Sequence, residues 1–121
     1  LEALMGTIEK VQKRFNPALQ LLGVAIGNVD GKAKLDSDIR EMLDQKFGEG
    51  RVFKTAIKRS VKHREAPVYG RTILEHAPGT ESAKQFLALS REVADRLEAI
   101  LTPANNQVEL EQNVIQAAAN G

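Results

Sequence analysis

Two predicted strands separated by an amphipathic helix constrain the fold of this chain most strongly. The first is a nearly continuous apolar run at residues 19–26, and the second covers residues 51–57, with Val52 and Phe53 near its start. The first is short, contains Val and Ile, and lies between turn residues, which favours a strand buried on both faces, as in a parallel sheet. Between the two strands, residues 36–47 carry apolar residues at helical spacing, and Gly48 follows. The pattern therefore predicts a right-handed β-α-β unit and an α/β fold.

Helices are expected around this unit, with one short extended piece at residues 72–74. Residues 1–15 place apolar side chains on one helical face. Asp36 or Ser37 is the expected N-cap of the helix between the strands. Thr80 is the expected N-cap of a long amphipathic helix that ends near residue 101.

The chain is expected to divide into two parts at about residue 101. Residues 1–101 contain both predicted strands, which are too few for an independent open sheet. This part is therefore interpreted as the second half of a larger doubly wound domain. Residues 102–121 form a polar tail rich in Asn and Gln. Five of its residues have the spacing of one further short helix: Val108, Glu111, Val114, Ile115 and Ala118.

Positive charge is concentrated around the end of the second predicted strand. Residues 51–71 contain seven Lys and Arg but one acidic residue, Glu65, whereas the net charge of the whole chain is only +1. Most clusters of this kind are solvated surfaces. However, α/β proteins bind ligands at the carboxyl ends of parallel strands, so this cluster marks a candidate binding surface.

Composition excludes several kinds of site. The chain has no Cys, and therefore neither a disulfide nor a thiolate metal site. No metal site is expected at its two His residues, His63 and His76, which lack neighbouring ligands in the sequence. No apolar run approaches the ~20 residues that span a membrane. The P-loop pattern G-x-x-x-x-G-K-[ST] is absent, because Gly31-Lys32 is followed by Ala33. The chain alone is therefore not expected to hydrolyse ATP.

The stretch from Lys54 to Gly79 resembles a motif of the ParA-type partition ATPases, the deviant-Walker P-loop proteins of the ParA/Soj/MinD superfamily. The matching positions, in chain order, are Lys54-Thr55, Ile57, Arg59, Glu65-Ala66-Pro67, Gly70, Ile73 and Pro78. Weaker similarity extends from Leu1 to about Leu97. The resemblance implies a parallel-sheet, P-loop NTPase-like domain, of which this chain is the C-terminal half. In that family the phosphate loop lies in the N-terminal half.

The resemblance also implies how the whole protein works. Such a protein binds ATP with Mg²⁺, forms a homodimer and coats DNA non-specifically. It releases the DNA when a centromere-bound, ParB-type partner triggers hydrolysis. It is expected to be cytoplasmic and associated with the nucleoid, with no membrane partner. For this chain alone no cofactor is expected, because the phosphate-binding groups are missing.

Two sets of residues acquire roles through this resemblance. At the adenine side of the nucleotide pocket, the family has Pro and Asn where this chain has Lys58 and Ser60. Asp30, after the first strand, is a further candidate for contacting the base, although an Asp-Gly turn is its simpler interpretation. For DNA phosphates, the matching basic positions are Lys32 and Lys62. Three more basic residues lie near them in the sequence: Lys34, Arg59 and Arg64.

Two other functions fit the residues. The chain could be a stand-alone DNA-binding α/β module without a nucleotide role. It could also belong to a related ATPase that positions a cargo other than DNA, such as a membrane surface. The tail disfavours a membrane, because residues 104–121 contain no Lys or Arg and membrane-surface helices are usually basic. Glu65-Ala66-Pro67 and Tyr69 are interpreted as structural residues.

Overall fold

The computed structural model describes residues 1–101, 112 and 114–120, and its elements alternate between helix and strand in the first half of the chain. The elements are α1 (Glu2–Arg14), β1 (Gly27–Val29), α2 (Ala33–Phe47), β2 (Ile57–Lys58), α3 (Lys62–Val68), α4 (Ile73–His76) and α5 (Glu81–Leu101). Residues 114–120 are also helical, in agreement with part of the predicted tail helix. Two residues of that prediction, Val108 and Glu111, lie outside the described residues.

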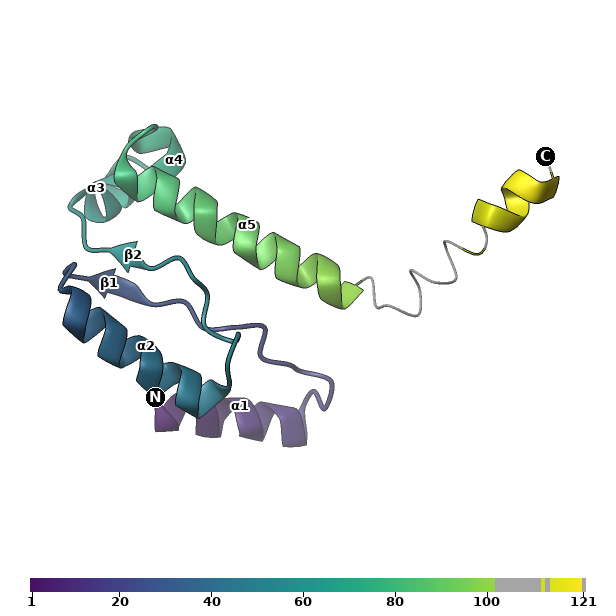
Figure 1. Cartoon of the computed structure of the whole chain (residues 1–121). Helices are drawn as coiled ribbons and strands as arrows, with labels where there is room; N and C mark the ends of the chain where they lie inside the picture. Colours follow the sequence, from purple (N-terminus) through teal and green to yellow (C-terminus); the bar gives the residue numbers. More distant parts are fainter. Residues whose placement is uncertain (102–111, 113, 121) are drawn as a thin grey trace.

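β1 and β2 form a parallel pair, as the β-α-β pattern predicts. Gly27 lies beside Ile57 and Val29 beside Lys58, and an isolated parallel bridge joins Val24 to Val52 upstream. The chain is therefore a mixed α/β chain with a small parallel sheet. Figure 1 shows the two strands between α2 on one side and α5 on the other.

The prediction of a strand at residues 19–26 was wrong in its position. Within that run Val24 forms an isolated bridge and the Ile26 carbonyl oxygen accepts a hydrogen bond from the Ile57 N–H, but the strand itself covers Gly27–Val29, which had been assigned to a loop. Asn28 has a φ of 59°, a left-handed conformation that favours Gly, Asn and Asp and usually marks a turn. The pairing register is irregular between Gly27 and Val29, so the left-handed conformation of Asn28 is accommodated as a bulge between two paired residues.

Two helix starts also differ from the prediction. α2 begins at Ala33, so that Lys32 and neither Asp36 nor Ser37 stands at its N-cap position. The expected extended piece at residues 72–74 is instead the start of α4. Thr72 and Glu75 form a capping box there, each side chain bonding the other residue's backbone N–H, which stabilises a helical start.

Thr80 does stand before the long helix α5, as predicted. Its hydroxyl oxygen accepts a 3.4 Å hydrogen bond from the Ala83 N–H, and its carbonyl oxygen accepts one of 3.0 Å from the Lys84 N–H. α5 continues to Leu101. The proposed division of the chain after that residue remains a prediction.

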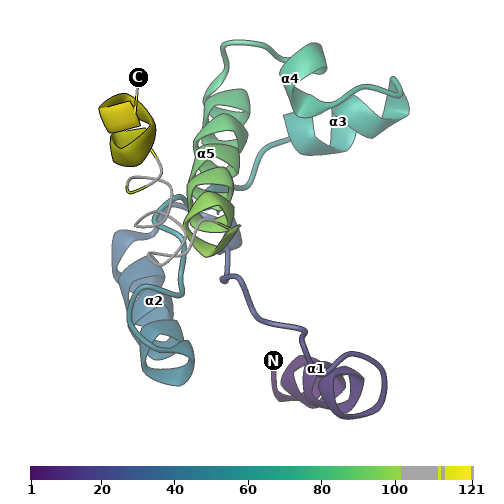
Figure 2. The same cartoon turned by 90° about the vertical axis from the view of Figure 1, so that its right-hand side faces the viewer.

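The core is small and lies between the strands and α2. Its central cluster consists of Ile26, Val29, Leu43 and Val52. By contrast, α1 buries no residue, and Phe15 at its end is 80% exposed. Figure 2 shows α1 set apart from α2 and α5. The helix predicted at residues 1–15 is confirmed, but its apolar face is only partly covered: Met5, Ile8 and Val11 are half-buried, whereas Leu1, Leu4 and Phe15 are exposed.

Among the described residues, we find no helix with the length and hydrophobicity needed to cross a membrane.

Candidate functional site

The segments that follow β1 and β2 are joined at the carboxyl edge of the sheet. The Arg59 N–H donates a 2.9 Å hydrogen bond to the Val29 carbonyl oxygen, which extends the parallel pairing beyond β2. The Arg59 guanidinium then reaches across, with its Nε 3.2 Å from Asn28 Oδ1 and 3.4 Å from Asp30 Oδ1. Arg59 therefore ties the two exit segments together through both its backbone and its side chain.

α5 holds the β2 segment through its main chain. The carboxylate of Glu92 accepts hydrogen bonds of 3.0 Å from the Lys54 N–H and of 3.0 Å from the Thr55 N–H. Two turns earlier on α5, Gln85 Oε1 accepts a 2.9 Å hydrogen bond from the Lys58 N–H. Burial opposes ionisation of Glu92, but the bonds from Thr55 and Lys54 outweigh it and leave the pKa of this carboxyl below its usual value.

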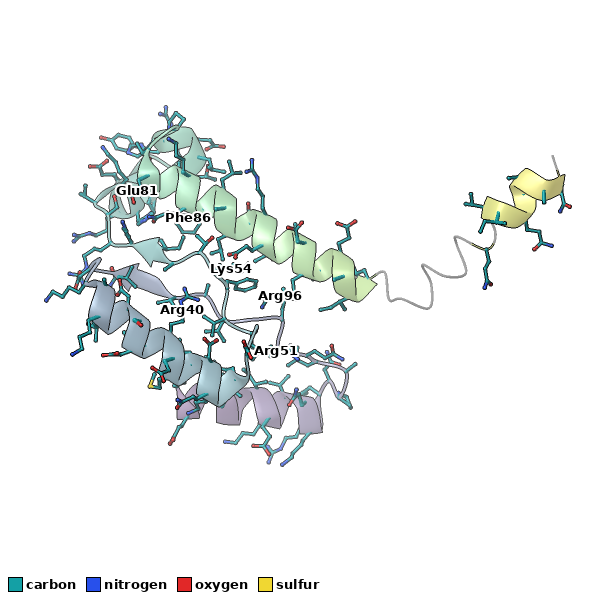
Figure 3. All side chains as sticks on the ribbon, viewed as in Figure 1. Arg40, Arg51, Lys54, Glu81, Phe86 and Arg96 are labelled. Carbon is teal, nitrogen blue, oxygen red and sulfur yellow. The ribbon has the colours of Figure 1, made fainter. Side chains whose placement is uncertain are left out.

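Arg96 completes this contact at the other end of α5. Its Nη1 donates to the Leu22 carbonyl oxygen at 3.0 Å and to the Arg51 carbonyl oxygen at 2.9 Å. The guanidinium lies 4.1 Å from the centre of the Phe53 ring, a cation–π distance. Figure 3 shows Arg96 reaching from α5 toward Arg51. A Cβ added at Gly23 would collide with both Arg96 and Phe53, so this close packing requires glycine.

Several cations of the β2 exit segment are paired with carboxylates. Lys58 Nζ lies 3.0 Å from Glu81 Oε1 on α5, and Lys62 Nζ lies 3.1 Å from Glu65 Oε2 on its own helix. All of these side chains are at least one-third exposed. Exposed ion pairs contribute only about 0–1 kcal/mol, so these cations can exchange one anion for another at little cost.

Three of the five DNA-binding candidates form no ion pair with any described residue. Lys32 stands at the N-cap position of α2, Lys34 lies in its first turn, and Arg64 lies in α3. All three are exposed. The other two candidates, Arg59 and Lys62, have the carboxylate partners described above.

A hollow of about 470 Å³ opens where the two exit segments meet. It is lined by Asn28, Lys58, Arg59, Ser60, His63 and Arg64. Lys58 and Ser60, the two nucleotide candidates after β2, therefore face a common space. Asp30 does not line it and pairs with Arg59 instead. Asn28 and His63 were missed by the sequence analysis, although an Asn after a buried apolar run is a recognisable turn signal.

Glu65 connects α3 to α4. Its Oε2 lies 3.0 Å from His76 Nε2 and 3.1 Å from Lys62 Nζ. The hydrogen bond to His76, followed by the one to Lys62, holds the pKa of the Glu65 carboxyl below its usual value. The His76 ring stacks on Tyr69, with centroids 5.2 Å apart. These contacts support structural roles for Glu65 and Tyr69.

A parallel β-α-β unit with basic exit segments defines an α/β protein with a candidate ligand surface at the carboxyl edge of its sheet. The chain matches no protein-family model. It is 39% identical over 95 residues to the chromosome-partitioning ATPase Soj of Thermus thermophilus. It is 34% identical over 94 residues to the sporulation initiation inhibitor protein Soj of Bacillus subtilis, and 32% identical over 96 residues to the chromosome partitioning protein ParA of Caulobacter vibrioides.

These matches cover most of the chain but a minor part of each relative. They span 78% of this chain for both Soj proteins and 79% for ParA, but only 38%, 37% and 36% of the three relatives. The chain is therefore a homologue of the Soj/ParA chromosome-partitioning ATPases that spans less than two-fifths of the length of these relatives.

Proposed function

We propose that this chain is the C-terminal part of a Soj/ParA-type partition ATPase and that it supplies the basic loops that contact DNA. Similarity to proteins named for chromosome partitioning over 78% of the chain supports the class. The observation that carries the DNA contact is the placement of the basic residues. Lys32 and Lys34 follow β1 and Arg59, Lys62 and Arg64 follow β2, at the same edge of a parallel pair.

DNA recognition by this surface would be electrostatic. α3 is seven residues long and does not resemble a recognition helix that could read bases in the major groove. Contacts to phosphates carry no sequence information, so affinity should be similar for different sequences. It should fall steeply with salt, with a log–log slope of about −0.9 for each phosphate contacted.

The hollow of about 470 Å³ is our candidate for the adenine side of a nucleotide pocket. Its size falls within the range of about 300–1,000 Å³ that is usual for small-molecule sites. The aliphatic stem of Lys58 can lie on a base, and the Ser60 hydroxyl can bond its edge. Phosphate and Mg²⁺ binding would depend on residues outside this chain, because the chain contains no P-loop sequence.

The whole protein would then be a cytoplasmic, nucleoid-associated P-loop NTPase. It would dimerise with ATP bound and respond to a centromere-bound, ParB-type partner. In such a dimer each subunit contributes one basic surface, which raises the avidity for DNA without any new contact within a subunit.

Charge reversal on both exit segments tests the proposal. In the whole protein, Lys32→Glu combined with Lys62→Glu should abolish DNA binding and leave ATP binding almost unchanged. The matched control is Lys10→Glu combined with Arg14→Glu, which makes the same change of charge on the exposed face of α1. Loss of ATP binding with DNA affinity retained would show that the basic segments serve a different ligand.

A further inference from the structure

A second hollow lies at the corner formed by α3, α4 and α5, and we call it the corner hollow. It has a volume of about 450 Å³, within the range of about 300–1,000 Å³ that is usual for small-molecule sites. Figure 1 shows α3 and α4 gathered at the start of α5. With the hollow at the carboxyl edge of the sheet it shares only His63. Its apolar lining consists of Ala66 and Pro67 of α3, Ile73 and Leu74 of α4, and Phe86 of α5.

Large apolar side chains of this lining are open to solvent. Leu74 and Phe86 are 46% and 38% exposed, whereas Ala66 is buried. A ligand that covers exposed apolar side chains removes their surface from water, which favours binding. The corner hollow is therefore suited to the apolar body of a ligand.

Arg71 adds one positive charge to this apolar lining. It is exposed, and its side chain forms no hydrogen bond or ion pair with any described residue. No acidic residue is among the described residues that line the hollow. A guanidinium group can hold a carboxylate through two parallel N–H···O bonds. A ligand with one carboxylate therefore complements the charge of this hollow.

The His63 ring gives a second indication of a ligand, independent of charge. Its Nε2 atom is buried and has no hydrogen-bond partner among the described residues. Buried polar groups almost always have such a partner. The ring packs edge-on against Phe86, with centroids 5.3 Å apart, and forms part of the wall of the corner hollow. Because the χ2 torsion of His is broad, a turn of the ring can bring Nε2 within reach of a ligand oxygen.

We propose that the corner hollow binds a small molecule with an apolar body and one carboxylate. The body packs on Pro67, Leu74 and Phe86, and Arg71 pairs with the carboxylate. His63 Nε2 donates a hydrogen bond to one of the carboxylate oxygens. This site does not require DNA contacts by the basic segments, and its failure would leave the proposed function intact.

Amide chemical shifts in the whole protein test this site, because they report where a ligand binds. We would titrate the ¹⁵N-labelled whole protein with phenylbutyrate and, separately, with phenylbutanol, which has the same body without the charge. The amide signals of Ile73, Leu74 and Phe86 should move with both probes. The carboxylate should bind about tenfold more tightly, the usual worth of a hydrogen bond to a charged group. Unmoved signals with phenylbutyrate, or equal affinities for the two probes, would overturn the proposal.

Two variants separate recognition of the ligand from damage to the fold. Arg71→Gln should weaken the binding of phenylbutyrate about tenfold and leave that of phenylbutanol unchanged. Arg91→Gln makes the same change of charge on the exposed face of α5, outside the hollow, and is the control. Equal losses in these two variants would show that Arg71 does not hold the carboxylate.

His63→Phe keeps an aromatic ring but removes the unpartnered nitrogen. It should therefore raise the free energy of unfolding, measured by urea denaturation, while it weakens the binding of phenylbutyrate several-fold. A misfolded variant cannot produce both changes. Unchanged or tighter binding of phenylbutyrate by His63→Phe would contradict the assignment of His63 to the site.

Discussion

The segments that follow β1 and β2 are both basic, but they hold their cations differently. After β1, Lys32 and Lys34 are exposed and form no ion pair with a described residue. Lys58 at the end of β2 and Lys62 after it each lie within about 3 Å of a carboxylate. Counting charges alone would rate the β2 segment as the stronger binding surface. The pairing reduces the charge that the β2 segment has immediately available to an incoming phosphate, although Arg64 of that segment is exposed and forms no ion pair with a described residue.

The two segments also differ in how they are anchored. β2 and the residues just before it are bonded to α5, through Gln85 at Lys58 and through Glu92 at Lys54 and Thr55, so the segment after β2 leaves an anchored strand. The side-chain tie from the β1 segment runs through Asn28 and Asp30 to Arg59. The segment after β2 therefore has partly paired cations and leaves a strand anchored to α5, whereas Lys32 and Lys34 after β1 are unpaired among the described residues.

The largest effect should come from removing cations from each segment in turn. In DNA titrations of the whole protein, Lys32→Ala with Lys34→Ala should reduce the magnitude of the log–log salt slope by about 1.8, since each phosphate contact contributes about 0.9. Lys58→Ala with Lys62→Ala should reduce it less, because Glu81 and Glu65 already neutralise part of that charge. Equal reductions would show that the ion pairs do not limit phosphate contact.

The next effect concerns anchoring. Glu92→Ala removes the acceptor of two backbone N–H groups and should lower the free energy of unfolding by about 1–2 kcal/mol. Asp30→Ala breaks an exposed ion pair and should change it by less than about 0.5 kcal/mol. Urea denaturation measures both, with Glu98→Ala on the exposed face of α5 as the control. A larger loss for Asp30→Ala would reverse our assignment of the better-anchored segment.

A smaller effect is expected from releasing Arg59. Asp30→Asn removes the carboxylate 3.4 Å from the Arg59 Nε, so the guanidinium becomes more available to DNA. Affinity at low salt should rise about two- to fivefold, the equivalent of one exposed ion pair. Asp38→Asn makes the same change of charge on exposed α2 and corrects for the change in net charge. An equal gain in both variants would mean that Asp30 does not restrain Arg59.

The smallest effect is a dependence on pH. The pKa of Glu65 is lowered from 4.5 by His76 and Lys62, so the folded state holds its carboxylate more strongly than the unfolded state. Its contribution to stability is therefore fully present above about pH 4.5 and is lost as the pH falls through the lower folded-state pKa. The stability difference between the native protein and Glu65→Gln should shrink as the pH falls below about 4.5. A difference that widens in acid would contradict the lowered pKa.

Some of this arrangement could be predicted from sequence, because it depends on neighbours in the chain. The helical periodicity of α5 and the cap at Thr80 depend only on residues close together in the sequence. The capping box of Thr72 and Glu75 is local in the same way, although the sequence analysis overlooked its T-x-x-E spacing. The position of β1 was not predictable in this way, since its pairing with β2 decides it. The ion pair from Lys58 to Glu81 joins residues 23 apart, and only the packing of α5 on β2 brings them together.

The contacts of α5 with the β2 segment also affect how freely this sequence can change. Glu92 and Gln85 accept hydrogen bonds from backbone N–H groups of the segment, and Arg96 donates to a carbonyl oxygen of it. A main-chain group is present whichever amino acid occupies the position. The side chains of Lys54 and Lys58 can therefore diversify while the anchor is kept, and relatives that preserve this stripe of α5 could evolve new ligand preferences at the sheet edge without losing the fold.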